Sequence, residues 1–157
     1  MTTRVLFVAA LLLAGCKTAP EVAANPALAF TAAKIGGGEQ VFDPGALAHP
    51  TLLVFWASWC ATCKAELPEV LELQRSKQGQ LDFIGVSVDE ETAKAEGYAQ
   101  EAKLPYPNVL DPNLRVADLF KVKGTPSFVL IDRNGEVKQV STAIDGPLLS
   151  AIALAVQ

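Results

Sequence analysis

An apolar run that leads into a Cys-x-x-Cys motif constrains this chain more than any other feature. Residues 51–56 read Thr-Leu-Leu-Val-Phe-Trp, and Cys60-Ala61-Thr62-Cys63 opens a stretch of helical character shortly after them. A continuous apolar run predicts a strand buried on both faces. Free backbone N–H groups at the start of the following helix stabilise a thiolate. The second cysteine lies on the same helix face, so the two sulfurs can form and break a disulfide.

Two other uses of this cysteine pair fit the sequence less well. A permanent disulfide between Cys60 and Cys63 would close only a small ring and would remove little chain entropy from the unfolded state. Zinc prefers four ligands, and His49 is the only histidine in the chain. The sequence therefore favours redox chemistry of the two thiols themselves, and we expect no metal and no cofactor.

The N-terminus has the order of charge and hydrophobicity typical of a bacterial export signal. Arg4 supplies a positive start, and Val5 to Leu13 form an apolar run too short to span a membrane. The run ends in Leu13-Ala14-Gly15-Cys16, which resembles the bacterial lipobox. The resemblance implies that Cys16 is lipidated, which leaves Cys60 and Cys63 as the thiols of the mature chain. An ordinary signal peptide with an unmodified Cys16 is the alternative.

This interpretation divides the chain into three parts. Residues 1–15 form the signal peptide, residues 16–27 the lipidated cysteine and a flexible tether, and residues 28–157 one domain. The net charge of −4 and the lack of a basic stretch argue against nucleic acid as a partner. We expect an exported protein that is lipid-anchored at a bacterial membrane, with its domain in the periplasm or extracytoplasmic space.

The hydrophobic pattern of the domain predicts alternating strands and helices. Strands are expected at 30–35, 40–42, 52–56, 81–88, 108–110, 127–131 and 136–140, and helices at 60–77, 89–103, 113–120 and 144–156. The acids Asp89, Glu90 and Glu91 are assigned to the start of the second helix, where negative charge is favourable. This order of elements predicts a mixed central sheet with helices on both faces.

Three further motifs give the domain a family resemblance. Residues 55–64, Glu66-x-Pro68 and Gly124-Thr125-Pro126-Ser127-Phe128 together resemble the thioredoxin fold, and within it the TlpA/ResA-like exported reductases. The helix and strand between about Asp89 and Leu110 fall where TlpA-like proteins carry an insertion. The resemblance implies an α/β thioredoxin-like fold with an N-terminal hairpin and a central insertion. It also implies a thiol–disulfide oxidoreductase of the protein-disulfide reductase type.

The roles of three residues follow from the motif and the resemblance. Cys60 is expected to be the exposed, attacking thiol, with a pKa lowered by the helix N-terminus. Cys63 is expected to be the more buried, resolving thiol. Glu66, one turn further along the helix, is similar in placement to the glutamate of the ResA-like branch and would accept the Cys63 proton. The alternative is a solvated Glu66 paired with Lys64 or Arg75.

The resemblance also implies a surface that contacts the substrate. Pro126 resembles the cis-proline that faces the cysteine pair, and Thr125 would offer its backbone to the segment around a partner's cysteine. Trp59 is expected to supply a flat contact surface, with simple packing as the alternative. Thioredoxin has a buried acid on the preceding strand, and the matching position here is the apolar Val54.

Three functions stay open on these residues. The first is an oxidoreductase that reduces cysteine-containing exported proteins, in cytochrome c or copper-site assembly for example. An exported or membrane thiol–disulfide partner would then return its cysteine pair to the reduced form. The second is a peroxidase of the same fold, although residues 57–60 lack the pattern of a peroxidatic cysteine. The third is a copper chaperone that uses Cys60, Cys63 and a third ligand.

Overall fold

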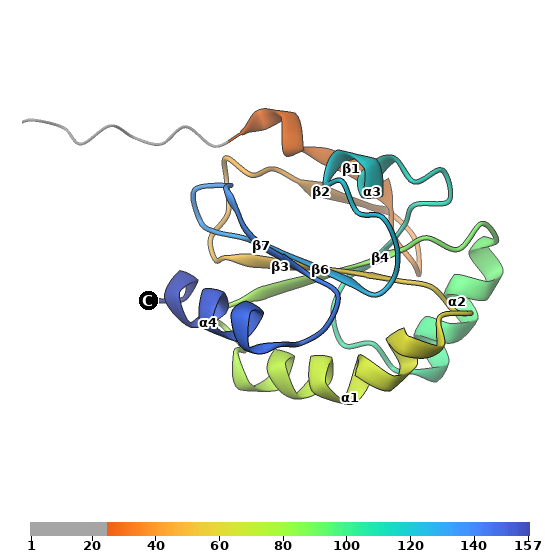
Figure 1. Ribbon diagram of the computed structural model, residues 1–157. Helices are drawn as coiled ribbons and strands as arrows, with labels where there is room; N and C mark the ends of the chain where they lie inside the picture. The colour runs from red at the N-terminus through yellow and green to blue at the C-terminus, as the bar shows by residue number, and fades with distance from the viewer. Residues whose placement is uncertain (1–24) are drawn as a thin grey trace, which may run out of the picture.

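The predicted mixed sheet is present in the computed structural model, which describes residues 25–157 (Figure 1). Its strand order is β5-β4-β3-β6-β7, with β3, β4 and β5 parallel and with β6 and β7 antiparallel to their neighbours. The strands are β1 (Phe30–Ala33), β2 (Glu39–Phe42), β3 (Thr51–Trp56), β4 (Asp82–Ser87), β5 (Asn108–Leu110), β6 (Ser127–Ile131) and β7 (Val137–Ser141). The helices are α1 (Ala61–Ser76), α2 (Thr92–Glu101), α3 (Arg115–Leu119) and α4 (Gly146–Ala155).

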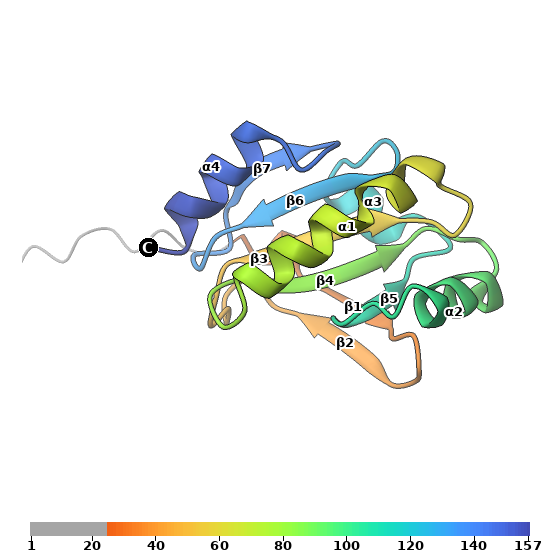
Figure 2. The same ribbon diagram turned by 90° about the horizontal axis from the view of Figure 1, so that it is seen from below.

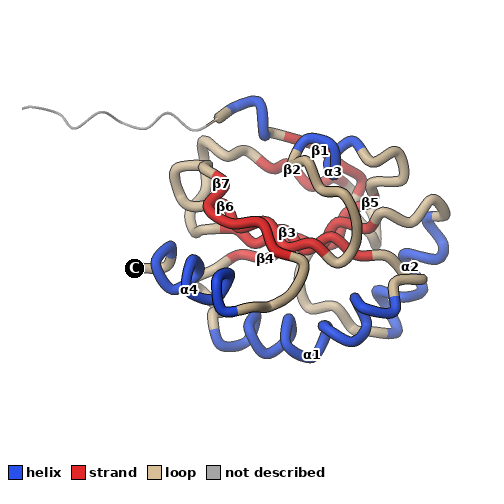
Figure 3. Tube along the Cα trace, viewed as in Figure 1, coloured by secondary structure: helices blue, strands red, loops and turns tan. Residues whose placement is uncertain are grey.

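Both faces of the sheet are covered, as the order of elements predicted (Figures 1 and 3). Strand β3 is buried along its whole length, which explains its continuous apolar run. On one face, Leu52 and Val54 pack in a core with Val70 of α1 and Leu148 of α4. The opposite face packs against α3 and the β1–β2 hairpin, and Figure 2 shows α1 lying across the sheet, with α4 and α2 at its two sides.

The N-terminal hairpin is attached to the edge of the sheet. Strands β1 and β2 pair antiparallel with Phe30 opposite Phe42, and the rings of these two residues stack at a centroid distance of 5.1 Å. Beyond β1, Lys34 forms a bridge with Val109 of β5, and the Ile35 N–H donates to the Asn108 carbonyl at 2.8 Å. The hairpin therefore lies over one face of the sheet and also borders its β5 edge.

A buried hydrogen bond connects β3 to the inserted strand β5. The Trp56 indole N–H donates to Asn108 Oδ1 at 3.0 Å, and Asn108 Nδ2 donates to the Tyr106 carbonyl at 2.6 Å. Gly85 of the intervening strand leaves the room for this bond, since a Cβ there would lie 1.8 Å from Asn108 Oδ1. Trp56 is thus a core residue, as expected, and the insertion is fixed directly beside the end of β3.

The first described residues differ from the predicted tether. Asn25 caps a short 3-10 helix, Pro26–Leu28, by accepting the Ala27 N–H at 3.1 Å. The last two positions of the predicted tether therefore adopt a defined turn of helix. The predicted signal peptide and Cys16 lie outside the described residues. Within residues 25–157, no helix is long and apolar enough to cross a membrane.

Candidate redox-active site

Cys60 and Cys63 form a disulfide at the N-terminal end of α1, with Cα atoms 5.3 Å apart. Strand β3 ends at Trp56, and a turn follows in which the Cys60 N–H donates to the Ala57 carbonyl at 3.1 Å. Cys60 is the N-cap of α1, and its sulfur accepts the Cys63 N–H at 3.1 Å. The positive end of the helix therefore points at the Cys60 sulfur, as the position of the motif predicted.

The prediction that Cys60 is exposed and Cys63 more buried is wrong for the disulfide form. Cys60 is 5% exposed and Cys63 is 8% exposed. The Cys60 sulfur folds back over the first turn of α1, and both cysteines belong to a cluster that includes Trp56 and Ala95 of α2. Trp59, directly before the motif, is 68% exposed, and Ala61 and Thr62 between the two cysteines are exposed as well.

The segment around Pro126 lies next to the cysteine pair. The Thr125–Pro126 peptide bond is cis, as the resemblance implied. Pro126 and Cys63 line the same small cavity, while Thr125 and Trp59 line an adjacent groove of about 300 Å³. Thr125 Oγ1 is buried and has no hydrogen-bond partner among the described residues. The fold thus brings together the predicted substrate-contacting residues, which are far apart in the sequence.

Glu66 lies behind Cys63 at a cavity of about 20 Å³ that both residues line. Its Oε2 atom accepts the Ile144 N–H from the loop before α4, at 3.1 Å. The alternative ion pairs are not formed. Arg75 pairs with Glu72, and the Lys64 ammonium lies over the Tyr98 ring, 5.3 Å from its centroid.

The other walls of this cavity are apolar or phenolic. Val54, the residue predicted to match the buried acid of thioredoxin, lines this cavity and is 5% exposed. Burial raises the pKa of Tyr106 far above its usual value, and burial also raises the pKa of Tyr98. Both hydroxyls therefore stay protonated at neutral pH. Among the described residues that line the cavity, Glu66 is the one carboxyl group.

Asp89 lies in the site, although the sequence assigned it to the start of a helix. It is 1% exposed, and three donors reach its carboxylate: the Ser58 N–H at 2.9 Å, the Ser58 hydroxyl at 2.6 Å and the Ser87 hydroxyl at 2.9 Å. Helix α2 begins later, at Thr92, and its N-cap Glu91 makes no side-chain capping bond. The assignment of Asp89 to that helix was therefore wrong.

The strand register explains this position of Asp89. Strands β3 and β4 are parallel, and Trp56 is opposite Ser87 at their ends. Because parallel strands end at the same edge of a sheet, the residues two positions further on, Ser58 and Asp89, are neighbours. The sequence did contain a signal for this contact: Ser58 and Asp89 each lie two residues past the end of one of two adjacent strands.

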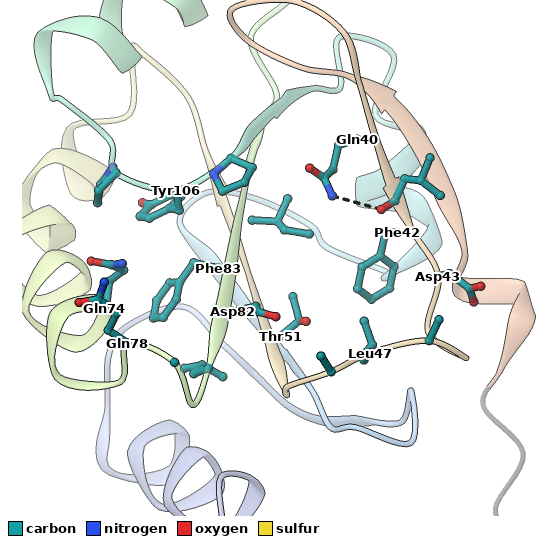
Figure 4. A pocket seen from close by; sticks show the side chains of 18 residues that line it. Gln40, Phe42, Asp43, Leu47, Thr51, Gln74, Gln78, Asp82, Phe83 and Tyr106 are labelled. Atoms are coloured by element: carbon teal, nitrogen blue, oxygen red, sulfur yellow. Dashed lines mark hydrogen bonds between the residues drawn. The ribbon is translucent and has the colours of Figure 1, made fainter.

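An open hollow of about 610 Å³ lies away from the disulfide (Figure 4). Its walls include Thr51 and Asp82, where β3 and β4 begin, and the amide side chains of Gln74 and Gln78. Cys60 follows the opposite end of β3, which is about 20 Å away for a strand of this length. The hollow is therefore separate from the redox pair.

The fold and the disulfide together define a thioredoxin-like protein with a Cys-x-x-Cys site. Comparison with known proteins agrees with this class. Residues 22–150 match the Redoxin family, and the chain belongs to that family.

Two relatives and one solved structure show which kinds of thioredoxin-like protein the chain is similar to. It is 38% identical over 92 residues to the thiol-disulfide oxidoreductase ResA of Geobacillus kaustophilus, a match that covers 57% of this chain and 52% of ResA. It is 27% identical over 142 residues to the soluble secreted antigen MPT53 of Mycobacterium tuberculosis, covering 89% of this chain and 78% of MPT53.

The solved structure is described as a thiol:disulfide interchange protein DsbE from Chlorobium tepidum. It superposes with a TM-score of 0.74 at 25% identity, over 86% of this chain and 98% of that one. The chain spans about half the length of the ResA relative that it matches. The predicted thioredoxin-like fold and the resemblance to ResA-like proteins are confirmed.

Proposed function

We propose that this protein is a thiol–disulfide oxidoreductase that reduces disulfides in partner proteins through Cys60 and Cys63. The observation that carries the proposal is the Cys63 N–H directed at the Cys60 sulfur at the start of α1. Such donors favour the thiolate and lower the pKa of the thiol in the reduced protein. The name of the relative ResA, a thiol-disulfide oxidoreductase, supports the same activity.

The proposed reaction transfers two electrons to the partner in two exchange steps. The Cys60 thiolate attacks one sulfur of the partner disulfide, and the other partner sulfur leaves as a thiolate that takes up a proton. Cys63 then loses its proton and attacks the Cys60 sulfur. The mixed disulfide breaks, the partner departs with two thiols, and the Cys60–Cys63 disulfide forms.

Glu66 is the proposed acceptor of the proton that Cys63 loses. The cavity that both residues line, at about 20 Å³, has room for about one water molecule to connect them. The bond from the Ile144 N–H holds one carboxylate oxygen and leaves the other free to accept a proton. Trp59 and Thr125, which line the adjacent groove, would contact the partner segment around its disulfide.

The proposed activity is tested by the reduction of insulin with dithiothreitol as electron donor. The wild-type protein is expected to accelerate the reduction, and Cys60→Ser is expected to abolish the acceleration because it removes the attacking sulfur. Hydrogen peroxide consumption as fast as insulin reduction would instead indicate a peroxidase. Retention of one Cu(I) per chain without insulin reduction would indicate a copper chaperone.

We further propose that the protein is exported and anchored through a lipid on Cys16. The order of charge, apolar run and small residues before Cys16 supports this, and the relative MPT53 is named a secreted antigen. Its partners would be cysteine-containing exported proteins, cytochrome c or copper-site assembly proteins for example. A second exported or membrane thiol–disulfide protein would return it to the reduced form, because that compartment is oxidising.

Replacing Cys16 by alanine is expected to release the protein from membranes. The ratio of soluble to membrane-bound protein should rise roughly tenfold or more, because the acyl chains supply the binding energy. Fractionation of cells that express each form measures this ratio, and insulin reduction by the released protein should match the wild type. A Cys16→Ala protein that stays in the membrane fraction would refute the lipid anchor.

A further inference from the structure

The turn that carries Trp59 and Cys60 is anchored by one buried carboxylate. Ser58 occupies the second position of this turn, which the bond from the Cys60 N–H to the Ala57 carbonyl closes. Asp89 accepts both the backbone N–H and the hydroxyl of Ser58, and the Ser87 hydroxyl completes its contacts. The loop from β3 to α1 is therefore connected through Asp89 to the end of β4.

We propose that Asp89 is a positioning residue for the redox pair and that its buried charge shifts the pair toward the disulfide. This inference rests on the proposed role of Cys60 as the attacking thiol. Asp89 would act in two ways. Its hydrogen bonds hold the turn that presents Trp59 and Cys60, and its negative charge disfavours the Cys60 thiolate.

The contacts of Asp89 indicate that it carries charge. All three neighbouring groups donate to its two oxygens, which is the pattern that an ionised carboxylate accepts. At 1% exposure, the charge is screened little by water. Asp89 binds Ser58, two residues before Cys60, and a like charge disfavours a thiolate, so the Asp89 charge opposes the N–H groups at the start of α1. Because a less stable thiolate makes a dithiol more reducing, Asp89 lowers the potential of the pair.

Other charged groups around the pair are more exposed than Asp89. Lys64 lies over Tyr98 on the solvent side of α1, and Glu66 is partly buried behind Cys63. Glu90 and Lys123 are both exposed and line the groove beside Trp59. Glu90 follows Asp89 in the chain and has the same charge, so Glu90→Gln is a matched control that removes an exposed charge.

The test compares the full-length reduced wild-type protein with Asp89→Asn, Ser58→Ala and Glu90→Gln. Two quantities are measured: the pH dependence of Cys60 alkylation by iodoacetamide, with the site located by mass spectrometry, and the equilibrium constant for oxidation by glutathione disulfide. Asp89→Asn is expected to move the alkylation midpoint to lower pH. It should also lower the equilibrium constant about tenfold, which corresponds to about 30 mV. Glu90→Gln should change both quantities less than twofold.

Ser58→Ala separates the charge from the hydrogen bonds. This variant keeps the Asp89 charge and the bond from the Ser58 N–H but loses the hydroxyl bond that holds the turn. Its alkylation midpoint should stay at the wild-type pH or rise, while kcat/KM for insulin reduction should fall severalfold. An unchanged kcat/KM would overturn the positioning role, and this result does not depend on whether Asp89→Asn folds.

Two outcomes would overturn the role of the charge. One is an Asp89→Asn protein that folds with the wild-type alkylation midpoint and equilibrium constant. The other is a Ser58→Ala protein whose midpoint falls as far as that of Asp89→Asn, because loosening of the turn would then explain both shifts. A wild-type protein that is inactive toward insulin would reject the proposed function. The comparison of alkylation midpoints would still test the role of the Asp89 charge, because alkylation needs no partner protein.

Discussion

Replacing Cys63 by serine is expected to convert the protein from a catalyst into a trap for its partners. Cys60 would still attack a partner disulfide, but no second thiol would be present to break the mixed disulfide. Multiple-turnover insulin reduction should fall by roughly 10³-fold, because an intramolecular thiol acts at an effective concentration far above that of millimolar dithiothreitol. Covalent complexes that dithiothreitol releases should appear on non-reducing gels of cells that express the variant.

Two controls identify which sulfur forms the trapped bond. The disulfide form buries both cysteines to a similar extent, so accessibility alone does not distinguish them. The hydrogen bond from the Cys63 N–H to the Cys60 sulfur does distinguish them, because it favours a thiolate on Cys60. Cys60→Ser should therefore trap far less partner than Cys63→Ser, and the double variant should trap none. Equal trapping by the two single variants would contradict the assignment of Cys60 as the attacking thiol. A Cys16→Ala background prevents trapping through the third cysteine.

Replacing Glu66 by glutamine is expected to slow the second exchange step by about 10²-fold near neutral pH. The amide oxygen can still accept the Ile144 N–H, so the loop before α4 should keep its position. The variant loses the proposed acceptor of the Cys63 proton, in a cavity whose phenolic walls stay protonated. Rapid mixing of the reduced protein with a fluorescent disulfide peptide measures formation and decay of the mixed disulfide separately.

Glu69→Gln is the matched control, because Glu69 lies on the same helix and is exposed. It should leave both steps at wild-type rates. For Glu66→Gln, formation of the mixed disulfide should stay within about twofold of wild type, because the proposed role of Glu66 concerns Cys63 and not Cys60. A decay rate that equals the wild-type rate across pH 6 to 9 would remove Glu66 from the mechanism.

The sequence predicted the redox pair and the architecture because these depend on local pattern. The apolar run of β3 and the Cys-x-x-Cys after it define one end of a buried strand and the start of a helix. The alternation of strands and helices predicted a mixed sheet, and the sheet is mixed. The family resemblance supplied the proline beside the site, since no local signal distinguishes a cis bond at Pro126.

The contacts that sequence reasoning missed all depend on register or on distant loops. Asp89 reaches Ser58 because β3 and β4 are parallel and end together, whereas its own neighbours in the chain favoured a helix cap. Glu66 is held by the Ile144 N–H, 78 residues away. The type of residue does not indicate which backbone N–H donates to Glu66, so this contact can be seen only in the folded structure.

The hairpin beside β5 affects how readily the sheet edges of two copies of this protein can pair. An uncovered sheet edge offers free N–H and C=O groups to another chain, and such edges promote aggregation. The segment that follows β1 occupies part of the β5 edge through Lys34 and Ile35. In the sheet of residues 25–157, the edge that stays open is β7, and Lys138 at its second position places a charge there. Chain-to-chain strand pairing is thus obstructed at one border by backbone and disfavoured at the other by charge.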